Sequence, residues 1–243
     1  MILVVDLGNT NIVFGLFNGK KLASEWRFST AKLKIPKINH KISAVIIASV
    51  VPALNKIIQK KLKKLYKCKV HFVTAQNIKG IKVMLKNKQE IGADRVADAL
   101  AAYRLYGGPT IIVDFGTATT FDLISNEGEY LGGAIAPGID LARDALYEHA
   151  AKLPKIKISA PKGVVGKNTK SAMQSGLVYG YAAMVDGMIK KIASHISRPA
   201  SRVKVIATGG LAPLICKYTT VVDTIDKKLT LKGLQMIGKK LNG

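Results

Sequence analysis

The fold of this chain is indicated most clearly by the stretch Ile111-Ile112-Val113-Asp114-Phe115-Gly116-Thr117-Ala118-Thr119-Thr120-Phe121-Asp122-Leu123-Ile124. An apolar run leads into Asp-x-Gly and small hydroxyl residues, and an alternating run leads out. This pattern predicts a buried strand, a tight turn and a return strand. Gly116 allows a close backbone approach or a left-handed turn, and the hydroxyl and N–H groups that follow suit an anion. Asp114 could hold a cation beside that anion. The alternative is an ordinary β-hairpin turn that Asp114 caps.

A second hairpin of the same kind begins the chain, with the sequence Leu3-Val4-Val5-Asp6-Leu7-Gly8-Asn9-Thr10-Asn11-Ile12-Val13-Phe14. It repeats the apolar lead, the Asp-x-Gly, the polar turn and the alternating exit. Asp6 and Asp114 lie 108 residues apart. A weak internal duplication of this length suggests two similar subdomains that face each other. We therefore expect one subdomain over residues 1–108 and another over residues 109–243.

Composition favours a globular α/β protein of the cytoplasm. The chain has 243 residues, of which 48% are hydrophobic, so it can bury a real core. Its two cysteines are far apart and form no CxxC pair, which favours a reducing compartment. The first residues enter a strand without a basic leader. The longest apolar run, residues 42–54, is too short to span a bilayer. We expect no membrane partner.

The net charge of +23 is concentrated toward the N-terminus, since residues 1–91 hold 18 basic and three acidic residues. The densest run, residues 56–69, has helical apolar spacing and predicts an amphipathic helix with a basic outer face. Such a face suits nucleic acid or an acidic membrane, or it is simply solvated. Only 6 of the 38 basic residues are arginine, and no aromatic residues interleave with them. Because base-reading and single-strand surfaces need those residues, we favour the solvated face.

The remaining segments predict alternating strands and helices. The pattern strand 44–51, helix 53–66 and strand 70–73 implies parallel pairing. Residues 91–106 predict a helix with Asp94 in its first turn, where the helix dipole favours a carboxylate; a plain capping role is the alternative. A long helix is expected over residues 171–196, with small residues that permit close helix contact in the core or across a dimer. No metal cluster, Walker A or Gly-x-Gly-x-x-Gly motif is present.

Six short motifs follow one another along the chain: Asp6-x-Gly8-Asn9-Thr10 with Gly15, Gly92-Ala93-Asp94-Arg95, Asp114-Phe115-Gly116-Thr117-Ala118, Gly132-Gly133-Ala134-Ile135-x-Pro137-Gly138, Gly166-Lys167-Asn168-Thr169, and Thr208-Gly209-Gly210. In this order and spacing they resemble the type III pantothenate kinase family, within the actin-like ATPase and sugar-kinase superfamily. The resemblance spans nearly the whole chain. It implies an α/β fold of two similar ribonuclease H-like subdomains, the actin-like ATPase fold, with a nucleotide cleft between them.

The resemblance also implies a reaction and its residues. ATP would phosphorylate the primary hydroxyl of pantothenate to give 4′-phosphopantothenate, the first step of coenzyme A biosynthesis. The family is homodimeric and requires Mg²⁺ and a monovalent cation, K⁺ or NH₄⁺. By position, ATP would be held by Asp6, Leu7, Gly8, Asn9, Thr10, Asn11, Ile12, Val13 and Thr117. Pantothenate would be contacted by Gly92, Ala93, Asp94, Arg95 and Thr169, with Asp94 as the general base. Asp114 would bind the monovalent cation.

One position departs from the family pattern, and two other functions stay open. Many members have a tyrosine seven residues before the Gly-Ala-Asp-Arg run, where this chain has Leu85, so one wall of the substrate pocket differs. The chain could be another superfamily kinase with a different small hydroxyl acceptor. It could also be a nucleic-acid-associated regulator like the Bvg accessory factors of the same family. Asp6, Asp94 and Asp114 favour an enzyme, because a scaffold has no use for three carboxylates at an anion site. We expect them to converge in space.

Overall fold

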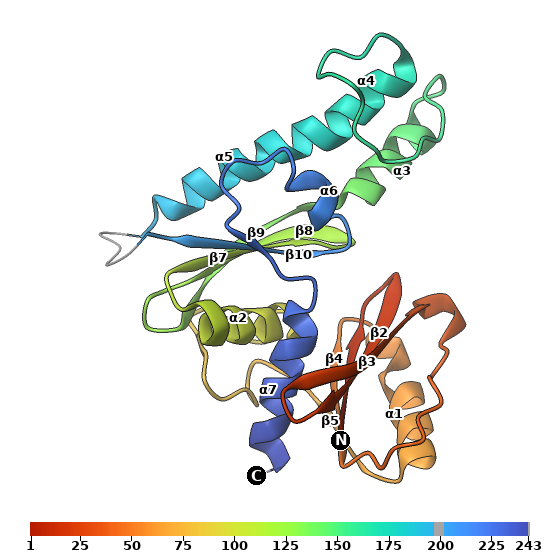
Figure 1. Ribbon diagram of the computed structural model, residues 1–243, viewed down its shortest axis with the longest axis vertical. Helices are drawn as coiled ribbons and strands as arrows, with labels where there is room; N and C mark the ends of the chain where they lie inside the picture. The colour runs from red at the N-terminus through yellow and green to blue at the C-terminus, as the bar shows by residue number, and fades with distance from the viewer. Residues whose placement is uncertain (197–201, 243) are drawn as a thin grey trace. The chain divides into compact units, whose positions relative to one another are not determined.

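The computed structural model describes residues 1–196 and 202–242, and the chain divides into two compact units (Figure 1). Unit 1 contains residues 1–105, 128–130 and 228–243, and unit 2 contains residues 106–127 and 131–227. None of the described helices combines the length and apolar composition that a bilayer crossing requires. The chain leaves unit 1 after residue 105 and again after residue 130, and it returns for residues 128–130 and for its last helix, α7 (Leu229–Asn242).

Unit 1 is built on a five-stranded sheet in the order β3-β2-β1-β4-β5. Its strands are β1 (Ile2–Leu7), β2 (Asn11–Asn18), β3 (Lys21–Ser29), β4 (Ala44–Ser49) and β5 (Lys69–Phe72). The first three form antiparallel pairs, and β4 and β5 continue parallel to β1. Gly19 takes a left-handed φ of 60° in the turn from β2 to β3, which is the geometry that an Asn-Gly hairpin needs.

Helices cover both faces of this sheet. The basic helix α1 (Pro52–Tyr66) begins at Pro52, where a missing N–H is harmless, and buries Ile58 and Leu62 against one face. Helix α7 covers the other face so closely that a Cβ on Gly238 would lie 2.7 Å from Ile46. Three further elements belong to unit 1, namely the 3₁₀ turn η1 (Thr30–Lys32), strand β6 (Lys82–Val83) and helix α2 (Ala93–Tyr106).

Unit 2 repeats the same sheet topology. Its strands are β7 (Thr110–Phe115), β8 (Ala118–Ile124), β9 (Glu129–Pro137), β10 (Lys204–Gly209) and β11 (Thr224–Ile225). They lie in the order β9-β8-β7-β10-β11, and the first residues of β9 pair with β6 of unit 1. As in unit 1, the leading hairpin is antiparallel and the next two strands are parallel to its first strand. The duplication predicted from two Asp-x-Gly hairpins is therefore present in the strand order.

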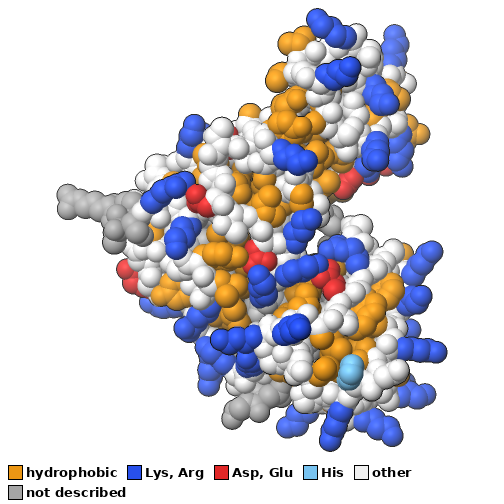
Figure 2. Space-filling view, in the orientation of Figure 1, with side chains coloured by type: hydrophobic (Ala, Val, Ile, Leu, Met, Phe, Trp, Pro, Cys, Tyr) orange, Lys and Arg blue, Asp and Glu red, His pale blue; other side chains and the backbone are white. Residues whose placement is uncertain are grey.

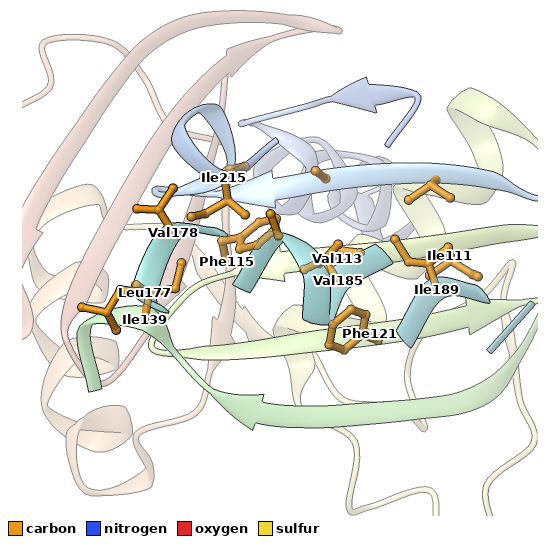
Figure 3. Close-up of a cluster of buried hydrophobic side chains, with 14 of the residues drawn as sticks. Ile111, Val113, Phe115, Phe121, Ile139, Leu177, Val178, Val185, Ile189 and Ile215 are labelled. Carbon is orange, nitrogen blue, oxygen red and sulfur yellow. The ribbon is translucent and has the colours of Figure 1, made fainter. Parts of the chain in front are cut away.

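The core of unit 2 lies between one face of this sheet and its helices (Figure 3). Alternate residues of β7, namely Ile111, Val113 and Phe115, belong to this core, and Ile111 and Val113 lie beside Ile189 and Val185 of α5 (Tyr181–Ala193). The other helical elements of this unit are α3 (Ile139–His149), α4 (Thr169–Ser175), the π-helical turn η2 (Gly176–Gly180) and α6 (Ala212–Ile215). Because odd-numbered residues of β7 fill this core, Asp114 must point to the opposite face of the sheet.

Two features differ from the sequence expectations. The predicted helix over residues 171–196 is helical without a break from Thr169 to Ala193, but it contains a π-helical turn, Gly176–Gly180, between α4 and α5. Glycine at both ends of that turn weakens regular α-helical geometry and accommodates the extra residue. The predicted boundary after residue 108 also differs from the observed units in α7. That helix belongs to unit 1 because Leu231 and Leu234 are buried there, with Leu231 close to Gly15 of β2.

Candidate functional site

The first Asp-x-Gly turn has an exposed, polar tip between buried apolar residues. The Gly8 N–H donates to the Asn11 carbonyl across 3.0 Å, and a Cβ on Gly8 would approach that oxygen to 3.1 Å. Asn9 and Thr10 are exposed at the tip, whereas the neighbouring side chains of Leu7, Ile12 and Val13 are buried. An anion at this turn would therefore meet N–H groups and short polar side chains.

Asp6 is the second-to-last residue of strand β1, just before this tip. It interacts electrostatically with Asp94 of α2, which also belongs to unit 1. Burial, with a smaller contribution from the negative charge of Asp94, raises the pKa of Asp6 from 3.8 to about 7. Arg27 opposes that shift. Part of Asp6 stays accessible to solvent. A cation bound near Asp6 and Asp94 would reduce the repulsion between the two carboxylates, beside a turn whose N–H groups suit an anion.

The Gly-Ala-Asp-Arg run forms the entry to helix α2. The Oδ1 atom of Asp94 accepts the Arg95 N–H at 2.8 Å and lies over Gly92, where a Cβ would stand only 2.4 Å away. The Arg95 guanidinium lies 5.8 Å from the centre of the Tyr130 ring. Ala93 is buried, and Asp94 and Arg95 are partly exposed. A larger residue at position 92 would therefore displace the Asp94 carboxylate from this position.

The second Asp-x-Gly turn is tighter than the first. Asp6 pairs with Val13 across the first hairpin, whereas Asp114 pairs with Thr120, one residue closer in sequence. The Gly116 N–H donates to the Ala118 carbonyl at 3.1 Å, and Thr117 is exposed at the tip. The φ angle of Gly116 is not positive. A close approach to Asp114 Oδ2, 3.3 Å from a Cβ at this position, accounts better for the glycine.

Two further glycines pack directly against the second turn, and the sequence had not linked them to it. A Cβ on Gly138, at the start of α3, would lie 2.1 Å from the Thr117 carbonyl oxygen. Gly209, at the end of β10, has a φ of 91°, and a Cβ there would lie 2.5 Å from both Asp114 Oδ1 and the Phe115 carbonyl oxygen. The Asp114 carboxylate therefore sits against bare backbone of the Thr-Gly-Gly loop.

The other predicted residues occupy separate positions. Thr169 is the exposed first residue of α4, directly after Asn168, whose side chain accepts the Ser171 N–H at 2.9 Å and caps the helix. Leu85 is partly buried and follows β6. Asp6 and Asp94 belong to unit 1, whereas Asp114 and Thr169 belong to unit 2. The structure thus brings the first two carboxylates together, and the convergence of all three stays a prediction.

Among the described residues, no group of three or more His, Cys, Asp or Glu side chains could hold a metal ion by itself. Mg²⁺ bound with a nucleotide needs only one or two carboxylates, because phosphate oxygens and water complete its shell. Asp6 and Asp114, each beside an Asp-x-Gly turn, fit that limited requirement.

Positive charge is concentrated in unit 1, which holds 24 lysine and arginine residues against six acidic residues. Figure 2 shows these side chains crowding the part of the view where α1 lies. The lysines at positions 56, 60, 63, 64 and 67 are all exposed, and none forms an ion pair with a described residue. The expected basic outer face of this helix is therefore present.

Comparison with solved structures supports the fold. A solved structure of a Baf family protein from Campylobacter jejuni matches with a TM-score of 0.66 and 21% identity over 98% of both chains. A polyphosphate/ATP-glucomannokinase from an Arthrobacter strain matches with a TM-score of 0.51 and 15% identity over 98% of both chains. These likenesses support the actin-like ATPase and sugar-kinase fold.

Sequence relatives are more specific. The type III pantothenate kinase of Desulfosudis oleivorans is 43% identical over 98% of both chains. That of Geobacillus thermodenitrificans is 42% identical over 99% of this chain and 98% of its own. The family model for type III pantothenate kinase matches residues 2–191. With the two Asp-x-Gly hairpins and the Gly-Ala-Asp-Arg helix entry in place, the chain belongs to the type III pantothenate kinase family.

Proposed function

We propose that this protein transfers the γ-phosphoryl group of ATP to the primary hydroxyl of pantothenate, yielding ADP and 4′-phosphopantothenate in the first step of coenzyme A biosynthesis. Full-length similarity at 43% identity to a type III pantothenate kinase carries this proposal. The geometry of unit 1 supports it, because a phosphate-type turn and the Asp94 carboxylate lie in the same unit and interact electrostatically.

ATP is assigned to the two Asp-x-Gly turns. Residues 6–13 would hold its phosphates mainly through backbone N–H groups, since three of their side chains are buried. Thr117, exposed at the tip of the second turn, would add a hydroxyl contact. Bound Mg²⁺ would neutralise charge on the phosphates during transfer. Asp6 is suited to face such a cation, because a nearby positive charge would favour its ionised form and reverse the effect of Asp94.

Pantothenate is assigned to Gly92, Ala93, Asp94, Arg95 and Thr169. During transfer the hydroxyl oxygen bonds to the γ-phosphorus while the bond from that phosphorus to the bridging oxygen of ADP breaks. The hydroxyl proton then passes to the Asp94 carboxylate, which acts as the general base. Because Asp94 Oδ1 accepts the Arg95 N–H, Oδ2 is the oxygen that would accept the proton. Arg95 offers a guanidinium that suits the carboxylate of pantothenate.

Asp114 is assigned to a monovalent cation, K⁺ or NH₄⁺. Its carboxylate lies beside Gly116 and Gly209, which have no side chain of their own. On strands β8 and β10 its neighbours in register are Thr120 and Thr208, which also offer oxygen atoms on the same face. A carboxylate and hydroxyl oxygens are the ligand types that such cations use.

The functional form is proposed to be a homodimer in the cytoplasm. An apolar groove of about 770 Å³ lies among α3, α4 and α5, with Leu146 and Met173 in its wall. Gly176, Gly180 and Gly187 have nothing within 4 Å of a Cβ, so close packing inside this chain does not explain them. Of the two expected reasons for small residues here, contact across a dimer is the better supported.

A coupled assay of ADP release tests the proposal. The protein should release ADP with pantothenate, and the rate should rise when K⁺ or NH₄⁺ replaces an inert cation. Activity only with another small hydroxyl acceptor, such as a sugar, would assign the chain to a different superfamily reaction. The alternative of a nucleic-acid-associated regulator rests only on the positive charge of unit 1. Its sign would be binding that is independent of ATP and falls steeply with salt.

A further inference from the structure

Thr30 contacts the first Asp-x-Gly turn from a distant part of the sequence. It is the first residue of η1, directly after β3, and only 6% of its surface is exposed. Its hydroxyl donates to the Gly8 carbonyl at 2.7 Å, and its backbone N–H donates to the Thr10 carbonyl at 3.0 Å. One residue thus holds two of the three carbonyls between β1 and β2.

The two hydrogen bonds differ in what they require of the sequence. The bond from the Thr30 N–H continues the antiparallel ladder of β2 and β3, which pairs Asn11 with Ser29, so most residues could supply it. The bond from the hydroxyl needs a side chain of this length and polarity. It joins residues 22 positions apart and is partly shielded from water, so it constrains the turn more than an exposed contact would.

The hydroxyl bond also determines where the next N–H points. A trans peptide unit is planar, and its C=O and N–H point in opposite directions. Because the Gly8 carbonyl points toward Thr30, the Asn9 N–H of the same peptide unit points away from Thr30, toward the exposed side of the turn. The Gly8 N–H is already bonded to the Asn11 carbonyl. The Asn9 N–H is therefore a donor that the turn can offer to an anion.

We propose that Thr30 is a positioning residue for ATP: its hydroxyl fixes the Gly8–Asn9 peptide so that the Asn9 N–H faces a phosphate oxygen. This inference rests on the proposed role of residues 6–13 in ATP binding. Thr30 itself touches the turn and not the reacting atoms. Its loss should therefore weaken ATP binding while leaving pantothenate binding unchanged.

The test compares Thr30→Val, which keeps the shape and removes the hydroxyl, with Thr30→Ser, which keeps the hydroxyl. For the valine variant we expect KM and Kd for ATP to rise about 3- to 10-fold, as for one lost internal hydrogen bond. KM for pantothenate should stay within experimental error, and the serine variant should regain most of the affinity. Thr74→Val is the matched control, because Thr74 is exposed in the same unit. Thr30→Ala replaces the valine variant if that protein does not fold.

A variant of the turn itself separates this inference from the proposed function. Asn9→Asp places a negative charge at the exposed tip and should weaken ATP binding if phosphates lie there. If Asn9→Asp weakens ATP binding and Thr30→Val does not, the role of Thr30 is wrong and that of the turn stands. If neither variant affects ATP, the turn does not hold the phosphates and both assignments fail. Equal loss of affinity for ATP and pantothenate in Thr30→Val would indicate a general structural role and overturn the inference.

Discussion

Substitution of Gly209 by alanine should disturb the Asp114 site, whereas the same change at the adjacent Gly210 should not. A Cβ at position 209 would lie 2.5 Å from Asp114 Oδ1, 2.5 Å from the Phe115 carbonyl oxygen and 2.6 Å from its carbon. The Asp114 side chain can rotate away, but the Phe115 peptide is held in the sheet by its pairing with Gly209. At Gly210 a Cβ meets nothing within 4 Å.

The size of the effect follows from two separate costs. Gly209 has a φ of 91°, and a left-handed conformation costs an alanine about 1–2 kcal/mol. The overlap with the Phe115 backbone adds about 1–3 kcal/mol, the usual range for overpacking. The free energy of unfolding should therefore fall by roughly 2–5 kcal/mol, and Tm by about 4–20 °C for a chain of this size. Gly210→Ala has neither cost, so its change should stay within about 0.5 kcal/mol.

The functional effect is measured well below the Tm of both variants. If Asp114 binds the monovalent cation, its displacement in Gly209→Ala should raise the K⁺ concentration for half-maximal activation about 10-fold, equivalent to about 1.4 kcal/mol. Thermal unfolding and K⁺ titrations of ADP release give both quantities. Equal behaviour of the two alanine variants would refute the close approach at Gly209. A destabilised Gly209→Ala protein with an unchanged K⁺ response would instead refute the cation role of Asp114.

Three further predictions concern other parts of the molecule. Asp94→Asn should lower kcat by about 10²–10⁴-fold while ATP still binds; unchanged turnover would remove Asp94 as the base. The pKa of Asp6 is raised from 3.8 to about 7, so the folded state holds its proton more tightly than the unfolded chain. The contribution of Asp6 to the free energy of unfolding is therefore largest below about pH 4. It is lost as the pH rises through 7, by at most about 4 kcal/mol. Asp6→Asn should flatten that pH dependence in urea unfolding, and an unchanged slope would contradict the shift. Leu146→Glu, in the apolar groove, should convert a dimer to a monomer, as measured by light scattering. The control Leu65→Glu, at a similarly exposed leucine of α1, should remain a dimer. A dimeric Leu146→Glu protein would place the interface elsewhere.

Local sequence patterns predicted the strands, the turns and the duplication well. Each Asp-x-Gly hairpin combines an apolar lead with an alternating exit, and those patterns act over neighbouring residues only. The parallel pairing of β4 and β5 followed from a short strand–helix–strand segment. The family resemblance then supplied residue roles that the local patterns had left open, such as the choice between a capping and a catalytic Asp94.

Contacts between distant segments were not predictable in the same way. Thr30 has no motif of its own, and its importance depends on lying against Gly8. Gly209 was recognised as part of a loop, but its contact with Asp114 joins residues 95 positions apart. The return of α7 to unit 1 also depends on side chains that meet only in the folded chain. The raised pKa of Asp6 likewise reflects burial and the neighbouring Asp94, which its own hairpin does not reveal.

The two hairpins share a topology but are held differently, and this difference supports different ligands. Both turns are exposed at their tips, but the first is one residue longer and is braced by the Thr30 hydroxyl. Such a turn offers N–H groups, which suits the phosphates of ATP. The second turn is packed against the backbones of Gly138 and Gly209, and this contact restricts the place of the Asp114 carboxylate. A carboxylate held in one position suits a cation, since the ligand need not be ordered on binding. Duplication therefore accounts for the common strand order, and the residues that pack against each turn account for the separate roles proposed for the two turns.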